Sequence, residues 1–131
     1  MKLKHILLAG LFAFGYAASA TAGSVSDADG DGVPDVFDNC SEIANGANEP
    51  AINQLDTNLD GFGNRCDPDY DNDGQVTTGD FAVFLSTFGG AGADTDHDGD
   101  GQVTTGDFAV FVSFFGGAPG PSGLSCAGTI P

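Results

Sequence analysis

The chain has 131 residues and a formal net charge of −16, because 19 Asp or Glu side chains stand against three Lys or Arg. This balance excludes nucleic acid as a partner, since contacts to phosphate need Lys and Arg. So much like charge keeps a chain expanded unless cations neutralise it. The placement of the acids therefore decides between a disordered chain and a cation-binding one.

The first 22 residues have the features of a signal peptide. A basic start is followed by an apolar run over residues 6–18, and small residues then allow cleavage after Ala20 or Ala22. The apolar run is too short to span a bilayer core of about 30 Å. We therefore expect a secreted, extracellular protein with no membrane span after signal removal. Cleavage takes away two of the three basic side chains and leaves a net charge of about −18.

The aspartates follow a strict register. Sixteen of the 17 Asp fall in four segments of twelve residues, 27–38, 56–67, 69–80 and 96–107, and Asp94 alone lies outside them. Each segment has Asp or Asn at positions 1, 3 and 5, Gly at position 6 and Asp at position 12. A solvated acidic tail would show no such register.

This pattern is that of the twelve-residue calcium loop of EF-hand type. Calcium takes six to eight oxygen ligands at about 2.3–2.6 Å, from side chains at positions 1, 3, 5, 9 and 12 and the carbonyl of position 7. Gly at position 6 permits the positive φ of a sharp turn. We predict about four bound Ca²⁺ ions, and the weakest site in the second loop, where Asn58 and Asn64 reduce the charge. Zinc is disfavoured, because nitrogen and sulfur ligands are few. The predicted ligands are Asp27, Asp29, Asp31, Val33, Asp35, Asp38, Asp56, Asn58, Asp60, Phe62, Asn64, Asp67, Asp69, Asp71, Asp73, Gln75, Thr77, Asp80, Asp96, Asp98, Asp100, Gln102, Thr104 and Asp107.

The first half of the chain, residues 23–68, resembles a thrombospondin type 3 repeat. The matching segments are DADGDGVPDVFDNC at 27–40 and NQLDTNLDGFGNRCDPD at 53–69. The resemblance implies a polypeptide that wraps calcium with little regular structure and is stapled by paired cysteines. The implied disulfide joins Cys40 to Cys66 and closes a loop of about 27 residues, which contributes about 3–4 kcal/mol by chain entropy. Cys126 is left over, either as an unpaired thiol or as a covalent link to another molecule.

The second half is an internal duplication. DNDGQVTTGDFAVFLSTFGG at 71–90 recurs as DGDGQVTTGDFAVFVSFFGG at 98–117, with three differences. Each loop leads into a short helix that contains the last ligand in its first turn, and a Gly pair ends each helix. Nothing helical precedes either loop.

Each expected helix has one apolar face. Its members recur at i, i+3, i+4 and i+7, and they are Phe81, Phe84, Leu85 and Phe88 in the first unit and Phe108, Phe111, Val112 and Phe115 in the second. We expect these rings to pack helix on helix. The alternative is an exposed adhesive surface, for which Phe114, in place of Thr87, would be an extra aromatic contact.

The doubled loop–helix arrangement resembles a type I dockerin over about residues 69–115. The resemblance implies two antiparallel short helices around a small shared core, within a unit spanning 69–117. Dockerins bind cohesin domains and tether enzymes, often carbohydrate-active ones, to scaffolds. Their recognition positions 10 and 11 are here Thr78, Gly79, Thr105 and Gly106. The tail, 118–131, is rich in Gly and Pro and is expected to be flexible, so the fold class is mostly irregular calcium-wrapped loops plus small α.

We find no catalytic constellation and expect no enzyme. His97 stands at loop position 2, where side chains are expected to point to solvent, and the paired carboxylates are assigned to calcium. Three interpretations remain: a calcium-stabilised extracellular structural or adhesion module, a dockerin-like tether for a carbohydrate-active assembly, and a subunit that self-assembles with calcium. The partners that they imply are extracellular protein, polysaccharide or copies of the chain itself.

Overall fold

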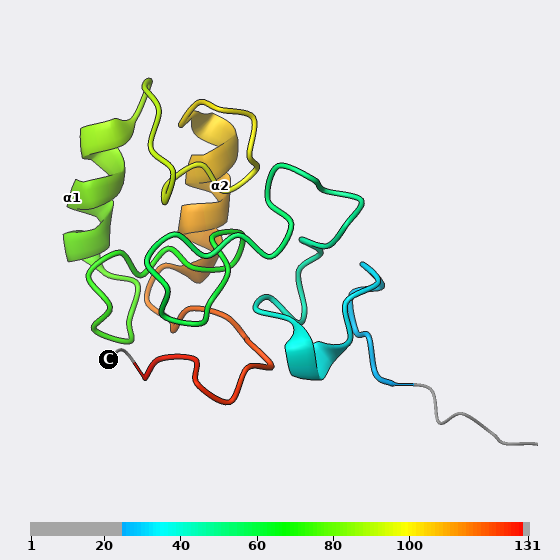
Figure 1. Ribbon diagram of the computed structural model, residues 1–131. Helices are drawn as coiled ribbons and strands as arrows, with labels where there is room; N and C mark the ends of the chain where they lie inside the picture. The colour runs from blue at the N-terminus through cyan, green and yellow to red at the C-terminus, as the bar shows by residue number, and fades with distance from the viewer. Residues whose placement is uncertain (1–24, 130–131) are drawn as a thin grey trace, which may run out of the picture.

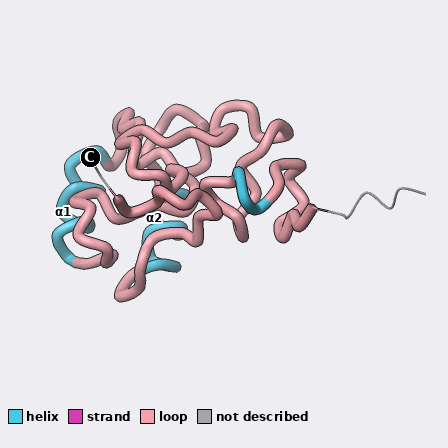
Figure 2. Tube along the Cα trace, turned by 60° about the horizontal axis from the view of Figure 1, so that its bottom comes forward, coloured by secondary structure: helices cyan, strands magenta, loops and turns pink. Residues whose placement is uncertain are grey.

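Figure 1 shows the computed structural model, which describes residues 25–129. Its regular elements are a 3-10 helix, η1 (Asp35–Phe37), and two α-helices, α1 (Thr78–Thr87) and α2 (Thr105–Phe114). Residues 25–129 contain no β-strand, and turns and loops make up the rest of the trace (Figure 2). The expectation of a mostly irregular chain with two short helices is confirmed. The predicted signal peptide lies outside the described residues, within which no helix is long and apolar enough to cross a membrane.

A threonine directly before each α-helix caps its first turn. The Thr77 hydroxyl accepts a backbone N–H of the first turn, while the Thr77 N–H donates to the Asp80 carboxylate at 2.7 Å, and α2 repeats this capping box. Such caps satisfy N–H groups that a helix start leaves without partners. Each helix ends just before a left-handed glycine, Gly89 (φ +82°) or Gly116 (φ +86°). The two helices therefore begin and end where the duplicated sequence predicts.

The two helices lie side by side and antiparallel, and the backbone joins them reciprocally (Figure 1). Val76, before α1, donates to the Gly117 carbonyl and accepts from the Gly116 N–H, both at 2.8 Å. Val103, before α2, accepts from Gly89 and donates to Gly90, also at 2.8 Å. The two loop–helix units are thus related by an approximate twofold axis that passes between the helices.

A small apolar core lies between the helices. It consists of the fully buried Val76, Phe84, Val103 and Phe111, with Tyr70, Phe81 and Phe114 packed against it. The expectation of helix-on-helix packing therefore holds for the middle of each apolar face. It is wrong for the outer positions, because residues 25–129 place no third layer over the two ten-residue helices, and Leu85, Phe88, Val112 and Phe115 stay about half exposed. Phe114, expected as an exposed contact, instead packs partly against the core.

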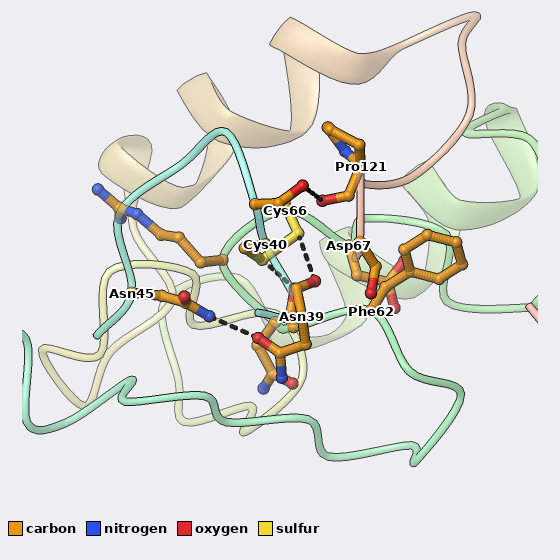
Figure 3. Close-up of a disulfide and its surroundings, with 12 residues drawn as sticks. Asn39, Cys40, Asn45, Phe62, Cys66, Asp67 and Pro121 are labelled. Atoms are coloured by element: carbon orange, nitrogen blue, oxygen red, sulfur yellow. Dashed lines mark hydrogen bonds between the residues drawn. A yellow bond between two sulfur atoms is a disulfide. The ribbon is translucent and has the colours of Figure 1, made fainter. Parts of the chain in front are cut away.

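The irregular first half is organised around the Cys40–Cys66 disulfide, as the resemblance implies (Figure 3). Beside it, the Asn45 amide donates to the Asn39 side chain at 2.7 Å, and Gln54 donates to Asn45 at 2.7 Å. Asn45 is fully buried. These amides fix the path of the segment between the first two loops, which has no helix or strand to define it.

The tail after α2 makes backbone hydrogen bonds to the first half, which its composition did not predict. Gly120 donates to the Cys66 carbonyl at 2.9 Å, Gly123 to Asp38 at 2.8 Å and Gly128 to Asp60 at 2.9 Å. Figure 3 shows Pro121 of the tail beside the disulfide. The irregular half has carbonyl groups that are not paired in a helix or a sheet, and backbone N–H groups of the tail donate to them.

Candidate metal centres

The four Asp-rich loops share one backbone scaffold. In each, one oxygen of the position 1 carboxylate accepts from the N–H of position 4 or 5, and the other accepts from the N–H of position 6. Gly at position 6 has a φ between +87° and +94° in all four loops. This confirms the sharp turn predicted there and curls every loop around its first carboxylate.

Positions 3 and 5 extend the curl. The side chain at position 3 accepts from the N–H of position 5, and the side chain at position 5 accepts from the N–H of position 7. Three loops gather three carboxylates with one oxygen each within 4.8 Å of the others. In the first and third loops these stand at positions 1, 3 and 5 (Asp27, Asp29 and Asp31; Asp69, Asp71 and Asp73), and in the fourth loop at positions 1, 3 and 12 (Asp96, Asp98 and Asp107). Oxygens that bind one ion at 2.3–2.6 Å have about this mutual spacing.

The position 12 carboxylate is buried in every loop. Asp38, Asp80 and Asp107 are 0% exposed and Asp67 is 3% exposed. In the third loop, Asp80 accepts from the Asp71 N–H at 3.2 Å with one oxygen and from the helix cap with the other. The position 12 side chain therefore links the start of a loop to its end. A ligand that completes the coordination of the ion has to stand at this point, opposite positions 1, 3 and 5.

Position 9 is already hydrogen-bonded within the protein. Asp35 accepts from the Ala28 N–H and Asn64 from the Thr57 N–H, at 2.7 and 2.8 Å, and Thr77 and Thr104 cap their helices. Hydrogen bonds from Ser26 and Ala28 lower the pKa of Asp35. Position 9 thus holds the loop together here, and its predicted contribution to the ion fits a contact through water.

The loop carboxylates repel one another in the absence of a cation. Burial, followed by repulsion from neighbouring carboxylates, raises the pKa of Asp29, Asp60, Asp69 and Asp98. The effect is largest at Asp67, where burial and then repulsion from Asp60 raise the pKa to about 8. A divalent cation among these groups would remove both costs, because it favours the ionised form.

Two buried oxygens in the first loop test whether a cation fits there. Oδ2 of Asp29 and Oδ2 of Asp38 have no hydrogen-bond partner within residues 25–129. Asp38 is fully buried, and its charge is among those that raise the pKa of Asp29. A buried carboxylate oxygen without a donor is costly, so an oxygen-seeking cation suits this donor set.

The second loop differs from the other three. Asn58 stands at position 3, and the loop forms no group of three tightly gathered carboxylates within the described residues. Asp94, the acid outside every loop, lies close enough for repulsion from Asp60 and Asp56 to add to burial in raising its pKa. The carbonyl of its neighbour Ala93 accepts from Asn64 at 2.6 Å. Asp94, from the linker before the fourth loop, thus lies close to the second loop. The spacing of the acids along the sequence did not predict this contact.

His97 is fully buried, which corrects the expectation that it points to solvent. Its Nδ1 contacts the Asn64 carbonyl, and its Nε2 lies 2.8 Å from the Tyr70 hydroxyl. A carbonyl can only accept, so Nδ1 carries the proton, and burial lowers the pKa of His97 and keeps it neutral. Arg65 donates to the His97 carbonyl at 3.1 Å. The second, third and fourth loops therefore meet at His97, because position 2 of the fourth loop faces the first half of the chain.

The arrangement defines a class: an Asp-rich loop protein whose carboxylates are placed for hard divalent cations. Residues 26–48 and 55–80 match the family model of the thrombospondin type 3 repeat. The second range runs through Asp67–Pro68, where the duplicated half was expected to begin, and ends at the last residue of the third loop. This match supports calcium as the cation and an extracellular setting, and nothing in it supports a dockerin or EF-hand region. No curated protein and no solved structure matches the chain.

Proposed function

We propose that this protein is a secreted calcium-binding structural or adhesion module, not an enzyme, whose folding is coupled to about four Ca²⁺ ions. One observation carries the proposal. Seven aspartates are buried in the described residues: Asp31, Asp38, Asp60, Asp67, Asp69, Asp80 and Asp107. Residues 25–129 contain a single Lys or Arg, Arg65, and its side chain donates to a backbone carbonyl.

Burial of that many carboxylates needs compensation from outside the chain. The effective cost of an unpaired buried charge is several kcal/mol per ion, and the net stability of a domain is about 5–15 kcal/mol. Backbone N–H groups offset part of this cost, but a remainder of only about 1–2 kcal/mol for each of the seven aspartates would already be comparable with the stability of the fold. Four Ca²⁺ ions would reduce the negative net charge from about −18 to about −10 and place positive charge among the buried carboxylates.

Each ion would be held by one loop. Positions 1, 3 and 5 offer convergent side-chain oxygens, position 12 adds the buried carboxylate, and the carbonyl of position 7 completes the set. The bound ion would hold the carboxylates of one loop together by electrostatic attraction, and the backbone hydrogen bonds of the loop keep those carboxylates in place. Affinities of about 10⁻⁴–10⁻³ M suffice for extracellular modules.

The test is calcium removal and return. EDTA should abolish the helical circular dichroism signal and protease resistance, calcium should restore both, and bound-metal analysis should give about four ions per chain. Asp107→Asn should remove one ion and loosen α2, whereas Glu49→Gln, an exposed acid outside every loop, should change neither. A spectrum and protease resistance that stay the same in EDTA would refute the proposal.

A second candidate is a dockerin-like tether, favoured by the reciprocal backbone pairing of the two loop–helix units. In that case the exposed Thr78, Gly79, Thr105 and Gly106 would contact a cohesin-type partner. Capture by immobilised cohesin domains in calcium tests this candidate, and failure to bind any of them counts against it.

A further inference from the structure

The outer side of the helix pair is an exposed apolar surface. Its members are about a third to a half exposed: Leu85 54%, Phe88 47%, Phe108 37%, Val112 52% and Phe115 52%. We call this surface, together with the partly buried Phe81, the Phe face. It lies across α1 and α2, which stand side by side in Figure 1.

The Phe face has the same approximate twofold symmetry as the helices. One hollow is lined by Phe81, Phe108, Phe111, Val112 and Phe115, and the other by Phe108, Phe81, Phe84, Leu85 and Phe88. The second set is the first with each residue replaced by its counterpart in the other repeat. The ring distances repeat as well: Phe84–Phe88 is 5.8 Å and Phe111–Phe115 is 5.9 Å.

The exposed apolar area suits an interface of ordinary size. Three phenylalanines exposed by 37–52%, with Leu85 and Val112 half exposed, present about 450 Å² if a large side chain covers about 200 Å². A standard interface buries about 800 Å² on each partner, of which about 56–65% is apolar, or about 450–520 Å². The Phe face alone therefore supplies the apolar share of such an interface.

Charge does not oppose contact between two Phe faces. Each helix contains one charged residue, Asp80 in α1 and Asp107 in α2, and both are fully buried. Two copies can therefore bring these faces together without placing carboxylates opposite one another. The acids that give the chain its charge stand mostly in the loops.

We propose that the Phe face binds a second copy of this chain and forms a twofold-symmetric dimer. A twofold interface needs a surface that is complementary to itself, and the Phe face presents both hollows and half-exposed Phe88 and Phe115 rings that a second copy can fill and use. A rotated copy places its exposed Phe88 and Phe115 rings toward the hollows of the first. This inference uses the calcium-loaded fold and goes beyond the proposed calcium binding.

The experiment is sedimentation equilibrium of the secreted chain in calcium, over a concentration series. Cys126→Ser is included in every sample, because Cys126 is exposed and could link copies covalently. We expect dimers with a Kd of ~1–100 μM. Leu85→Asn with Val112→Asn should weaken dimerisation by about tenfold or more, because both side chains would leave the interface.

The matched control is Val36→Asn with Leu59→Asn, which removes two apolar side chains that are 59% and 76% exposed and lie outside α1 and α2. It should dimerise like the wild type. Circular dichroism checks that each variant folds. A wild type that stays monomeric up to ~1 mM, a dimer that the Leu85 and Val112 substitutions leave unchanged, or a monomer that instead binds an unlike partner through this face would overturn the proposal.

Calcium content measured on the same samples separates the two proposals. A dimeric wild type without bound calcium would overturn the proposed function and leave the dimer surface standing. A calcium-loaded monomer would overturn the dimer surface and leave the proposed function standing.

Discussion

Replacing His97 by alanine tests the contact that joins the two halves of the chain. The side chain is fully buried and bonds to the Asn64 carbonyl and the Tyr70 hydroxyl. His97→Ala leaves both groups without that partner. An unsatisfied buried polar group costs about 1–3 kcal/mol, and the space left behind adds to this cost.

The expected loss of stability is therefore about 3–5 kcal/mol. For a domain of this size each kcal/mol lowers Tm by about 4–8 °C, so Tm should fall by at least about 12 °C. Thermal unfolding at saturating calcium, followed by circular dichroism, measures this loss. Hydrogen exchange should also rise in residues 56–67, far from the substitution in sequence, because the second loop loses its contact with the fourth.

Tyr70→Phe is the matched control. It removes the hydroxyl that bonds to His97 but keeps the contact between His97 and Asn64, so it should cost about 1 kcal/mol. A cost below about 1 kcal/mol for His97→Ala, as for a solvent-facing histidine, would refute this reasoning. Unchanged hydrogen exchange in the second loop would do the same.

Two further predictions concern the first half. Replacing both Cys40 and Cys66 by Ala should lower the free energy of unfolding by about 3–4 kcal/mol in a denaturant titration, whereas Cys126→Ser should leave it unchanged. In the metal-free fold, burial raises the pKa of Asp67 from an ordinary 3.8 to about 8. Asp67 therefore favours that fold fully below about pH 4, and this contribution to stability is lost as pH rises through 8. The proposed coupling leaves the calcium-free chain unfolded, with Asp67 at its ordinary pKa and ionised at pH 7, so calcium uptake should release almost no proton. Calorimetry in buffers of different ionisation enthalpy measures this release. Release of close to one proton that Asp67→Asn removes would show that the fold forms before calcium binds, and would contradict the coupling.

Much of the local structure could be predicted from the sequence because the loops are self-contained. A register of Asp, Gly and Asp specifies the turn at position 6, and the duplicated Thr and Gly specify where each helix begins and ends. Each of these features depends on residues a few positions apart. The paired cysteines followed from a resemblance, which carries long-range information that spacing alone does not.

The contacts between loops could not be predicted in the same way. His97 and Tyr70 both stand at position 2, where the first two loops have Ala28 and Thr57. A large polar ring at a position that is usually solvated was the available signal, but its partner, Asn64, is 33 residues away in sequence. The contacts of the tail were missed for a related reason, because Gly and Pro composition does not show where carbonyl groups stand nearby to accept its hydrogen bonds.

The two halves solve the problem of a small core in different ways. The second half buries two phenylalanines and two valines between its helices, whereas the first half buries Ile52 and the disulfide, with the rest of its interior polar. Both halves nevertheless bury a carboxylate at position 12 of each loop. At Asp80 and Asp107 the carboxylate also completes the capping box of a helix, but Asp38 and Asp67 lie outside both α-helices. A cation that completes the interior is therefore the rationale for Asp that all four loops share. The buried carboxylate at position 12 is thus the feature through which calcium would order all four loops.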